Sequence, residues 1–432
     1  MLRNADNDLS TDQHDQSGAR GSAPGRERYR ADVNTRQRTT LILAVVAQAA
    51  VSIIQFGLPA IGIEVRERFD LGPAGFGVVF AAVGLGSAVA LIPIGMLVDR
   101  FGARPVLLGG AAVNLMAYLS AAVADTAALF AAAIFVAGMG SAAVPVAGMS
   151  SLLREFPPER RGVALGWRQL AVPLGGTIGA AVLPLLADAG GVRLALAFAA
   201  VATAITAAGF ALLAPAAGGE ARRLRLDGAL TAPGMRPLLV VGILYVLCLS
   251  ATLTYIVPAA RDAGLTRAQA GALFLAVNVA AAASRLVWGR MADRRGGTRR
   301  ARTIAECGAL AAISALAMPL ALHAGFAPAA VLTALLAFGA FGWNGVLYVT
   351  AGELVGPERA GRAVGVASTM VFGAGAIGSP LAGLVAQWAG YDAMWIAAAL
   401  CSALGAAVAT RVLLPRVAAT AGRAAAAGAP AR

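Results

Sequence analysis

Twelve apolar runs follow one another along this chain of 432 residues, and they constrain its fold more than any other feature. A helix of about 20 to 26 residues, rising about 1.5 Å per residue, crosses the roughly 30 Å hydrocarbon core of a bilayer. Charged residues make up only 13% of the chain and lie mainly between the runs, whereas soluble domains carry about 25%. The sequence therefore predicts an all-α membrane protein with twelve transmembrane helices. The runs are 40–62, 73–98, 105–124, 126–151, 162–186, 190–214, 237–259, 269–292, 303–322, 328–352, 361–386 and 392–413.

The runs form two sets of six, separated by a polar segment, which indicates two six-helix bundles. We expect these bundles over residues 40–214 and 237–413, with a cytoplasmic linker over 215–236 and a cytoplasmic tail over 414–432. Residues 1–39 are rich in Asp, Arg, Gly and Ser and lack an apolar core. They are therefore expected to form a disordered cytoplasmic tail, without a secretory signal.

The basic residues predict the orientation of the chain in the membrane. All 35 are Arg, and positive residues accumulate in cytoplasmic loops. With both termini in the cytoplasm, the opposite loops hold only Arg66, Arg68, Arg193, Arg261 and Arg267. We expect a multi-pass, monomeric protein of a bacterial plasma (inner) membrane. Because the arginines are spread over short loops, nucleic-acid binding is not indicated.

Cysteine and histidine are too few and too scattered for a metal site. Cys248, Cys307 and Cys401 lie within apolar runs, while His14 and His323 lie in the tail and in a loop. No metal-ligand spacing, phosphate-binding loop or nucleophile motif is present in the sequence. We therefore expect no metal, no cofactor and no enzymatic activity.

The two halves repeat the same blocks of sequence in the same order. The charged stretch GMLVDRFGARP from Gly95 is echoed by GRMADRRGGTRR from Gly289, and PERRGVALG from Pro158 is echoed by PERAGRAVG from Pro357. Such repeats predict two bundles in parallel orientation, related by an axis along the membrane normal, as in many transporters.

The pattern Gly-x-x-x-Asp-Arg-x-Gly-x-Arg between the second and third runs resembles the signature loop of the major facilitator superfamily, and the resemblance covers about residues 40–413. It implies a secondary active transporter whose bundles rock around a central site and expose a small solute to each side in turn. It also implies that Asp99 docks on the helix beginning near Gly361, where the helix dipole favours an anion, and that Asp293 faces the helix near Gly162. The gate residues implied are Gly95, Asp99, Arg100, Gly102, Arg104, Gly289, Asp293, Arg294 and Gly296. Alternatively, the arginines serve only as orientation signals.

Other stretches bear on the kind of transporter. GWRQLAVPLGG from Gly166 resembles bacterial permeases for cyanate and organic anions, whereas Ile134 stands where many proton-driven exporters carry Arg. A drug or metabolite exporter with an apolar cavity remains an alternative. A non-transporting membrane sensor is a remote one, because the tail and the linker are short for an output domain.

Two arginines lie inside apolar runs, where ionisable groups are costly and usually functional. Arg168 and Arg285 come from opposite bundles, each about 9 to 12 Å from the predicted cytoplasmic helix end. No Asp or Glu is expected near mid-membrane, and paired guanidinium groups are suited to holding an anion. The alternative is that both side chains extend to the cytoplasmic rim as anchors or gates.

Polar side chains on the apolar helices are weaker candidates for substrate contact, and for each of them a role in helix packing is the alternative. Asn344 and Tyr348 are four residues apart and share a helix face. The set comprises Gln48, Gln55, Gln169, Tyr245, Tyr255, Asn278, Trp343, Asn344 and Tyr348.

Overall fold

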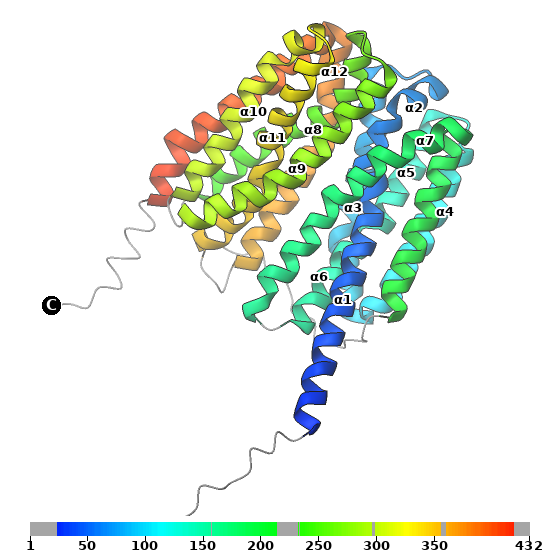
Figure 1. The fold of residues 1–432 in the computed structure, drawn as a ribbon, viewed down its shortest axis with the longest axis vertical. Coiled ribbons are helices and arrows are strands. Elements are labelled where there is room, and N and C mark those ends of the chain that lie inside the picture. Colours follow the sequence, from blue (N-terminus) through cyan, green and yellow to red (C-terminus); the bar gives the residue numbers. More distant parts are fainter. Residues whose placement is uncertain are drawn as a thin grey trace, which may run out of the picture.

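The structure is a computed structural model that describes residues 24–156, 158–213, 232, 234–295, 299–355 and 360–418. Within these residues the chain is built of helices and contains no strand, which confirms the all-α class (Figure 1). The first half comprises α1 (Pro24–Gly57), η1 (Leu58–Ile61), α2 (Gly62–Phe69), α3 (Pro73–Phe101), α4 (Ala103–Val123), α5 (Ala127–Ser141), α6 (Ala143–Glu155) and α7 (Pro158–Leu213). The second half comprises α8 (Met235–Asp262), α9 (Arg267–Arg295), α10 (Arg299–His323), α11 (Phe326–Val355), α12 (Ala360–Val408) and η2 (Ala409–Leu413).

The described residues contain 10 helices that are long and apolar enough to cross a membrane. Two of these are much longer than one crossing requires, Ala164–Leu213 with 50 residues and Ala363–Ala418 with 56. Each is interrupted by a glycine with positive φ, Gly191 at +70° and Gly390 at +82°, a conformation that breaks the helix and that glycine adopts at little cost. Each long helix therefore provides two crossings, which gives the twelve that the sequence predicts.

The two halves lie side by side and meet along two helix pairs, α3 with α12 and α7 with α9 (Figure 1). Within the first half α1 packs on α7, and within the second half α8 packs on α12. We call the end that carries the start of α1 and the end of η2 the inner end, and the end that carries α2 and the α10–α11 turn the outer end. These names follow the orientation that the sequence predicts.

Three details differ from the expected boundaries. Helix α1 already begins at Pro24 and so extends into the segment 1–39 that was predicted to be disordered. The first apolar run ends in the short 3-10 helix Leu58–Ile61, since Pro59 has no N–H to continue the α-helical bonding. The fourth run is divided between α5 and α6 at Ala142. Most of the linker at 215–236 lies outside the described residues.

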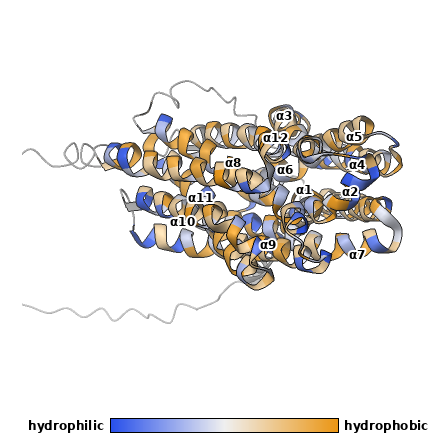
Figure 2. Cartoon of the chain, turned by 90° about the horizontal axis from the view of Figure 1, so that it is seen from above, coloured by the Kyte–Doolittle hydropathy of each residue, from blue (hydrophilic) through white to orange (hydrophobic). Residues whose placement is uncertain are grey.

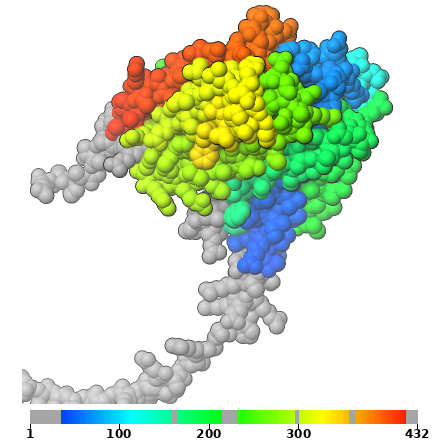
Figure 3. Space-filling model, turned by 45° about the horizontal axis from the view of Figure 1, so that its top comes forward, coloured from blue at the N-terminus to red at the C-terminus, as the bar shows by residue number. Residues whose placement is uncertain are grey.

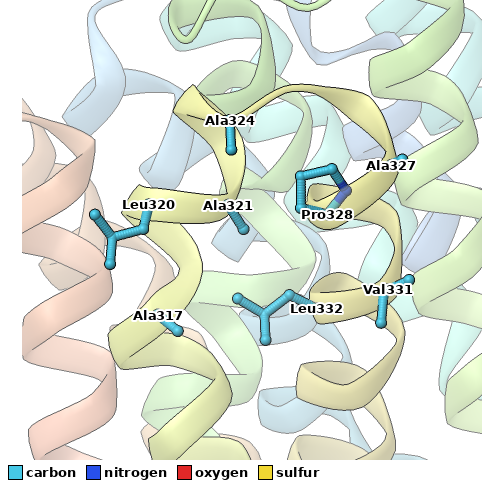
Figure 4. Close-up of a pocket in the computed structure, with 8 residues that line it drawn as sticks. All are labelled: Ala317, Leu320, Ala321, Ala324, Ala327, Pro328, Val331 and Leu332. Atoms are coloured by element: carbon cyan, nitrogen blue, oxygen red, sulfur yellow. The ribbon is translucent and has the colours of Figure 1, made fainter.

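Seen from above, the helices are largely hydrophobic, with hydrophilic residues interspersed (Figure 2). Leu320, Ile313 and Leu185 are 77%, 69% and 68% exposed, which suits contact with lipid. A hollow between α10 and α11 is lined only by apolar side chains, among them Leu320 and Val331 (Figure 4). Because it offers no polar group, we assign this hollow to the lipid-facing surface. This surface, together with the length of the apolar helices, makes the chain a multi-pass membrane protein.

Candidate functional site

Charged and polar side chains join the two halves at the outer end. Arg267, the first residue of α9, pairs with Glu64 of α2 and lies 2.7 Å from a carboxylate oxygen of Asp188 on α7. Nearby, Arg66 Nη1 donates to the hydroxyl of Tyr391 on α12 over 3.1 Å. In the space-filling view the outer parts of α2 and α12 lie against each other (Figure 3). These five residues form the outer contact cluster, and they hold the halves together on this side.

Tyr255 of α8 reinforces the outer contact cluster from within the protein. Its hydroxyl lies 2.9 Å from the carbonyl oxygen of Pro73 in the first half and 2.8 Å from that of Ser379 in the second. A Cβ atom at Gly77 would lie 2.2 Å from this hydroxyl, so glycine is needed for α3 to approach. Tyr255 is 0% exposed. Tyr255 thus joins the two halves through its hydroxyl, and its contact with substrate remains a prediction.

At mid-depth the halves meet where α7 crosses α9. Arg285 Nη1 of α9 donates to the backbone carbonyl of Gln169 over 3.0 Å. Asn278 is only 3% exposed; its amide donates to the carbonyl of Phe274, and its oxygen occupies the space beside Gly176. Asn278 thus packs between α7 and α9, and its contact with substrate remains a prediction. The hydrogen bonds and ion pairs between described residues of the two halves all lie between Arg285 and the outer end.

Arg168 lies in the first half and is 6% exposed. Its Nη1 donates to Gln48 Oε1 of α1 over 3.0 Å and to the carbonyl of Pro145 on α6 over 3.3 Å. Its Nε is enclosed and has no hydrogen-bond partner. The side chain thus connects three helices through neutral acceptors, and its positive charge is not balanced by these contacts.

Arg285 shows the same arrangement in the second half. Its Nη1 is bonded to the Gln169 carbonyl, and its Nε is enclosed without a partner. Tyr348 of α11 lies close enough to interact with the guanidinium electrostatically, and it also lies beside Ser368. No ion pair joins Arg168 or Arg285 to a carboxylate among the residues described here. Arg285 thus lies against the backbone of Gln169, the residue that follows Arg168 on α7.

Some of the other predicted substrate contacts are buried, and the rest are at least partly accessible. Trp343 is 0% exposed, its indole N–H donates to the carbonyl of Ala340 over 2.6 Å, and its ring packs edge-on against Tyr245. We therefore reassign Trp343 to the core. In contrast, Gln55 is half-buried and Gln169 is exposed, and neither side chain bonds to a described residue. Asn344 is half-buried, with a single long bond of 3.5 Å to its own helix.

The charged loop of the first half is exposed at the inner end. Asp99, Arg100 and Arg104 are all exposed, and Asp99 forms no hydrogen bond or ion pair with any described residue. The loop turns at Gly102, whose φ of +84° separates α3 from α4. The side chain of Arg362, in the helix on which Asp99 is expected to dock, lies outside the described residues, so the docking remains a prediction.

The equivalent loop of the second half is engaged within its own half. Asp293 lies 3.5 Å from Arg300, which also pairs with Glu353, and Arg295 pairs with Glu306 over 2.5 Å. The side chains near Gly162 lie outside the described residues, so the docking of Asp293 on that helix remains a prediction. A Cβ added at Gly289 would meet open space. Arg294 is exposed, and Gly296 lies outside the described residues.

Two parallel six-helix halves, held together at one end and carrying an unbalanced arginine each at mid-depth, define a membrane carrier built on a two-fold repeat. The chain belongs to the major facilitator superfamily, because the model of that family matches residues 40–376 and again 238–431. This confirms the family that the repeated charged loop predicts.

Related proteins agree with this assignment. An uncharacterised MFS-type transporter of Mycobacterium tuberculosis, present in two strains, is 29% identical over 322 residues, which cover 73% of this chain and 71% of that protein. A solved structure shares the fold with a TM-score of 0.69 at 16% identity, covering 92% of this chain and 99% of that one. It is a bacterial homologue of the human lysosomal transporter Spinster, in an inward-facing and unoccupied conformation.

Proposed function

We propose that this protein is a secondary active transporter that moves a small organic or inorganic anion across the bacterial plasma membrane by alternating access, with both termini in the cytoplasm. The observation that carries this proposal is the pair of guanidinium groups of Arg168 and Arg285. They come from different halves, lie at the same level of the α7–α9 crossing, and have no carboxylate partner among the described residues.

The energetics of buried charge favour an anionic ligand. A charged side chain inside the membrane is expensive unless it is paired, and here each Nη1 is held by neutral oxygens while each Nε lacks a partner. An anion between the halves would supply the missing charge, and a guanidinium group can bind a carboxylate through two parallel bonds. We assign Gln55, Gln169, Asn344 and Tyr348 to the lining of this site.

The contacts between the halves suggest how transport proceeds. In this structure they are concentrated at the outer end, so an anion would exchange with the inner side. Access from the outer side requires the bonds of Arg267 and Arg66 to open. In the proposed cycle Asp99 then docks on the other half and closes the inner end, using the favourable charge of a helix N-terminus.

The first test measures anion uptake into proteoliposomes containing purified protein. We expect Arg285→Gln and Arg168→Gln each to weaken anion binding at least tenfold, because a hydrogen bond to a charged group contributes about 1.5 to 3 kcal/mol. Arg→Lys should restore only part of the binding, since an ammonium group lacks the planar fork. Arg290→Gln is the matched control, because Arg290 is exposed near the inner end of the same helix as Arg285.

A contrary result would be equally informative. Transport of a neutral or cationic solute that is unaffected by both Gln substitutions would contradict the anion proposal. It would favour the alternative, a drug or metabolite exporter of the same superfamily.

A further inference from the structure

Gln48 is the side chain that holds the buried guanidinium of Arg168. It lies on α1, is 4% exposed, and accepts from Arg168 Nη1 over 3.0 Å. Its own amide nitrogen lies 3.4 Å from Ser52 Oγ, which in turn donates to the Gln48 carbonyl over 2.8 Å. Because arginine only donates hydrogen bonds, the amide oxygen of Gln48 must be the atom that faces it.

The position of the guanidinium places this contact deep in the membrane. The Cδ of Arg168 packs against Gly148, where an added Cβ would lie at an ordinary contact distance of 3.6 Å. Its Nη1 reaches Pro145, which precedes the end of α6 at Glu155 by ten positions, or about 15 Å at 1.5 Å per residue. The guanidinium of Arg168 therefore lies well within the span of α6 and away from its inner end.

The chemistry of Gln48 is suited to a reversible contact. A carboxylate at this position would neutralise the guanidinium permanently, whereas an amide oxygen satisfies one donor and leaves the positive charge in place. Arg168 Nη2 forms no bond with a described residue, and unlike Nε it is not fully enclosed. An anion that reaches Nη2 lies beside the donor that Gln48 occupies.

We infer that Gln48 is a placeholder for the substrate: its Oε1 occupies the donor on Arg168 that an oxygen of the anion takes over when the anion binds. This inference rests on the proposed function. A planar anion with two oxygens, such as a carboxylate, would then engage Nη1 and Nη2 together. Once its oxygen is released, the amide nitrogen of Gln48 can donate to the same anion, so Gln48 would also help to bind it.

The experiment compares Gln48→Glu and Gln48→Leu with the wild type, using purified full-length protein in detergent. Thermal unfolding is recorded in titrations with sodium formate, acetate, nitrate and malonate, at an ionic strength held constant with sodium chloride, whose monatomic anion cannot form two parallel bonds with a guanidinium group. Gln48→Glu should weaken binding of the most stabilising anion at least tenfold, since the new carboxylate occupies Arg168. Gln48→Leu should bind that anion at least as tightly as the wild type, since the competing oxygen is gone.

Two further variants separate the outcomes. Gln37→Glu adds the same charge to the same helix near the inner end, where Gln37 Nε2 donates to the carbonyl of Glu155, and this variant should bind the anion normally. If the anion stabilises the wild type and this effect is lost in Arg285→Gln but retained in Gln48→Glu, the placeholder is wrong and the anion site stands. If none of the four anions stabilises the wild type, the anion proposal fails and this inference fails with it.

Discussion

The two charged loops at the inner end are near copies in sequence, yet they differ in structure. In the first half, Asp99 is exposed and bonds to no described residue. In the second half, Asp293 pairs with Arg300, which also holds Glu353. A conserved pattern of residues within one chain therefore does not fix the contacts that the pattern makes. These depend on the charges that each half places around its loop.

The repeat itself shows why the neighbours differ. When PERRG of the first half is matched to PERAG of the second, Arg154 stands at the position of Glu353. The first half thus presents a cation where the second presents the acid that anchors Arg300. Without that anchored cation Asp99 remains available to the other half, whereas Asp293 is held by its own. We therefore expect the two aspartates to contribute unequally to gating.

The largest effect is expected from the turn of the first loop. Gly102 has φ +84° and ψ 168°, a conformation that is essentially restricted to glycine. Gly102→Ala should destabilise the protein by about 1 to 3 kcal/mol through backbone strain. The measurement is thermal unfolding in detergent. Gly109→Ala on α4 is the control, because a Cβ there meets open space; equal effects of the two substitutions would contradict the argument.

A smaller effect is expected from the aspartates themselves. Asp99→Asn should remove a helix-terminus interaction of about 1 kcal/mol from the inward-closed state, which raises the ratio of inward-open to inward-closed protein roughly fivefold. Labelling of a cysteine introduced at the inner end of a cysteine-free variant reports this ratio. Asp293→Asn should change the labelling less than twofold. A larger response from Asp293 than from Asp99 would reverse the proposed asymmetry.

The smallest effect is expected from the arginine that distinguishes the loops. The side chain of Arg300 is 15% exposed, but those of Asp293 and Glu353 are 74% and 49% exposed, so solvent screens both pairs. Arg300→Gln should therefore lower stability by only about 0.5 kcal/mol. Arg104→Gln in the first half should leave it unchanged. If the Asp293→Asn variant is labelled as strongly as the Asp99→Asn variant, the second loop also acts as a gate.

The sequence predicted the fold well because membrane helices can be recognised by the length and composition of their apolar runs. The apolar segments and one repeated loop were enough to predict the twelve helices, the two halves and the family. Which face of each helix is buried was less readable, since helices such as α11 are apolar all round. Trp343 and Tyr255, for example, are predicted substrate contacts, and the structure buries both side chains completely.

Contacts between the halves were the least predictable part of the molecule. Arg267 and Glu64 are 203 positions apart in the chain, and neither belongs to a motif. Their meeting depends on how the two bundles tilt against each other at the outer end, which no local pattern encodes. By contrast, Arg168 and Arg285 were identified because a charge within an apolar run is rare enough to be noticed by itself.

The single hydroxyl proton of Tyr255 has a consequence for how the outer end separates. The oxygen lies within bonding distance of two carbonyls, Pro73 in one half and Ser379 in the other, but one proton can be donated to only one of them at a time. When the halves part, the proton can remain with Ser379, which belongs to the same half as Tyr255. The tyrosine then keeps its full complement of donated bonds, and the freed Pro73 carbonyl can be hydrated from the outer side. Separation at this point therefore leaves no buried donor unsatisfied, because Tyr255 keeps Ser379 as its acceptor and water takes the place of Tyr255 at the Pro73 carbonyl.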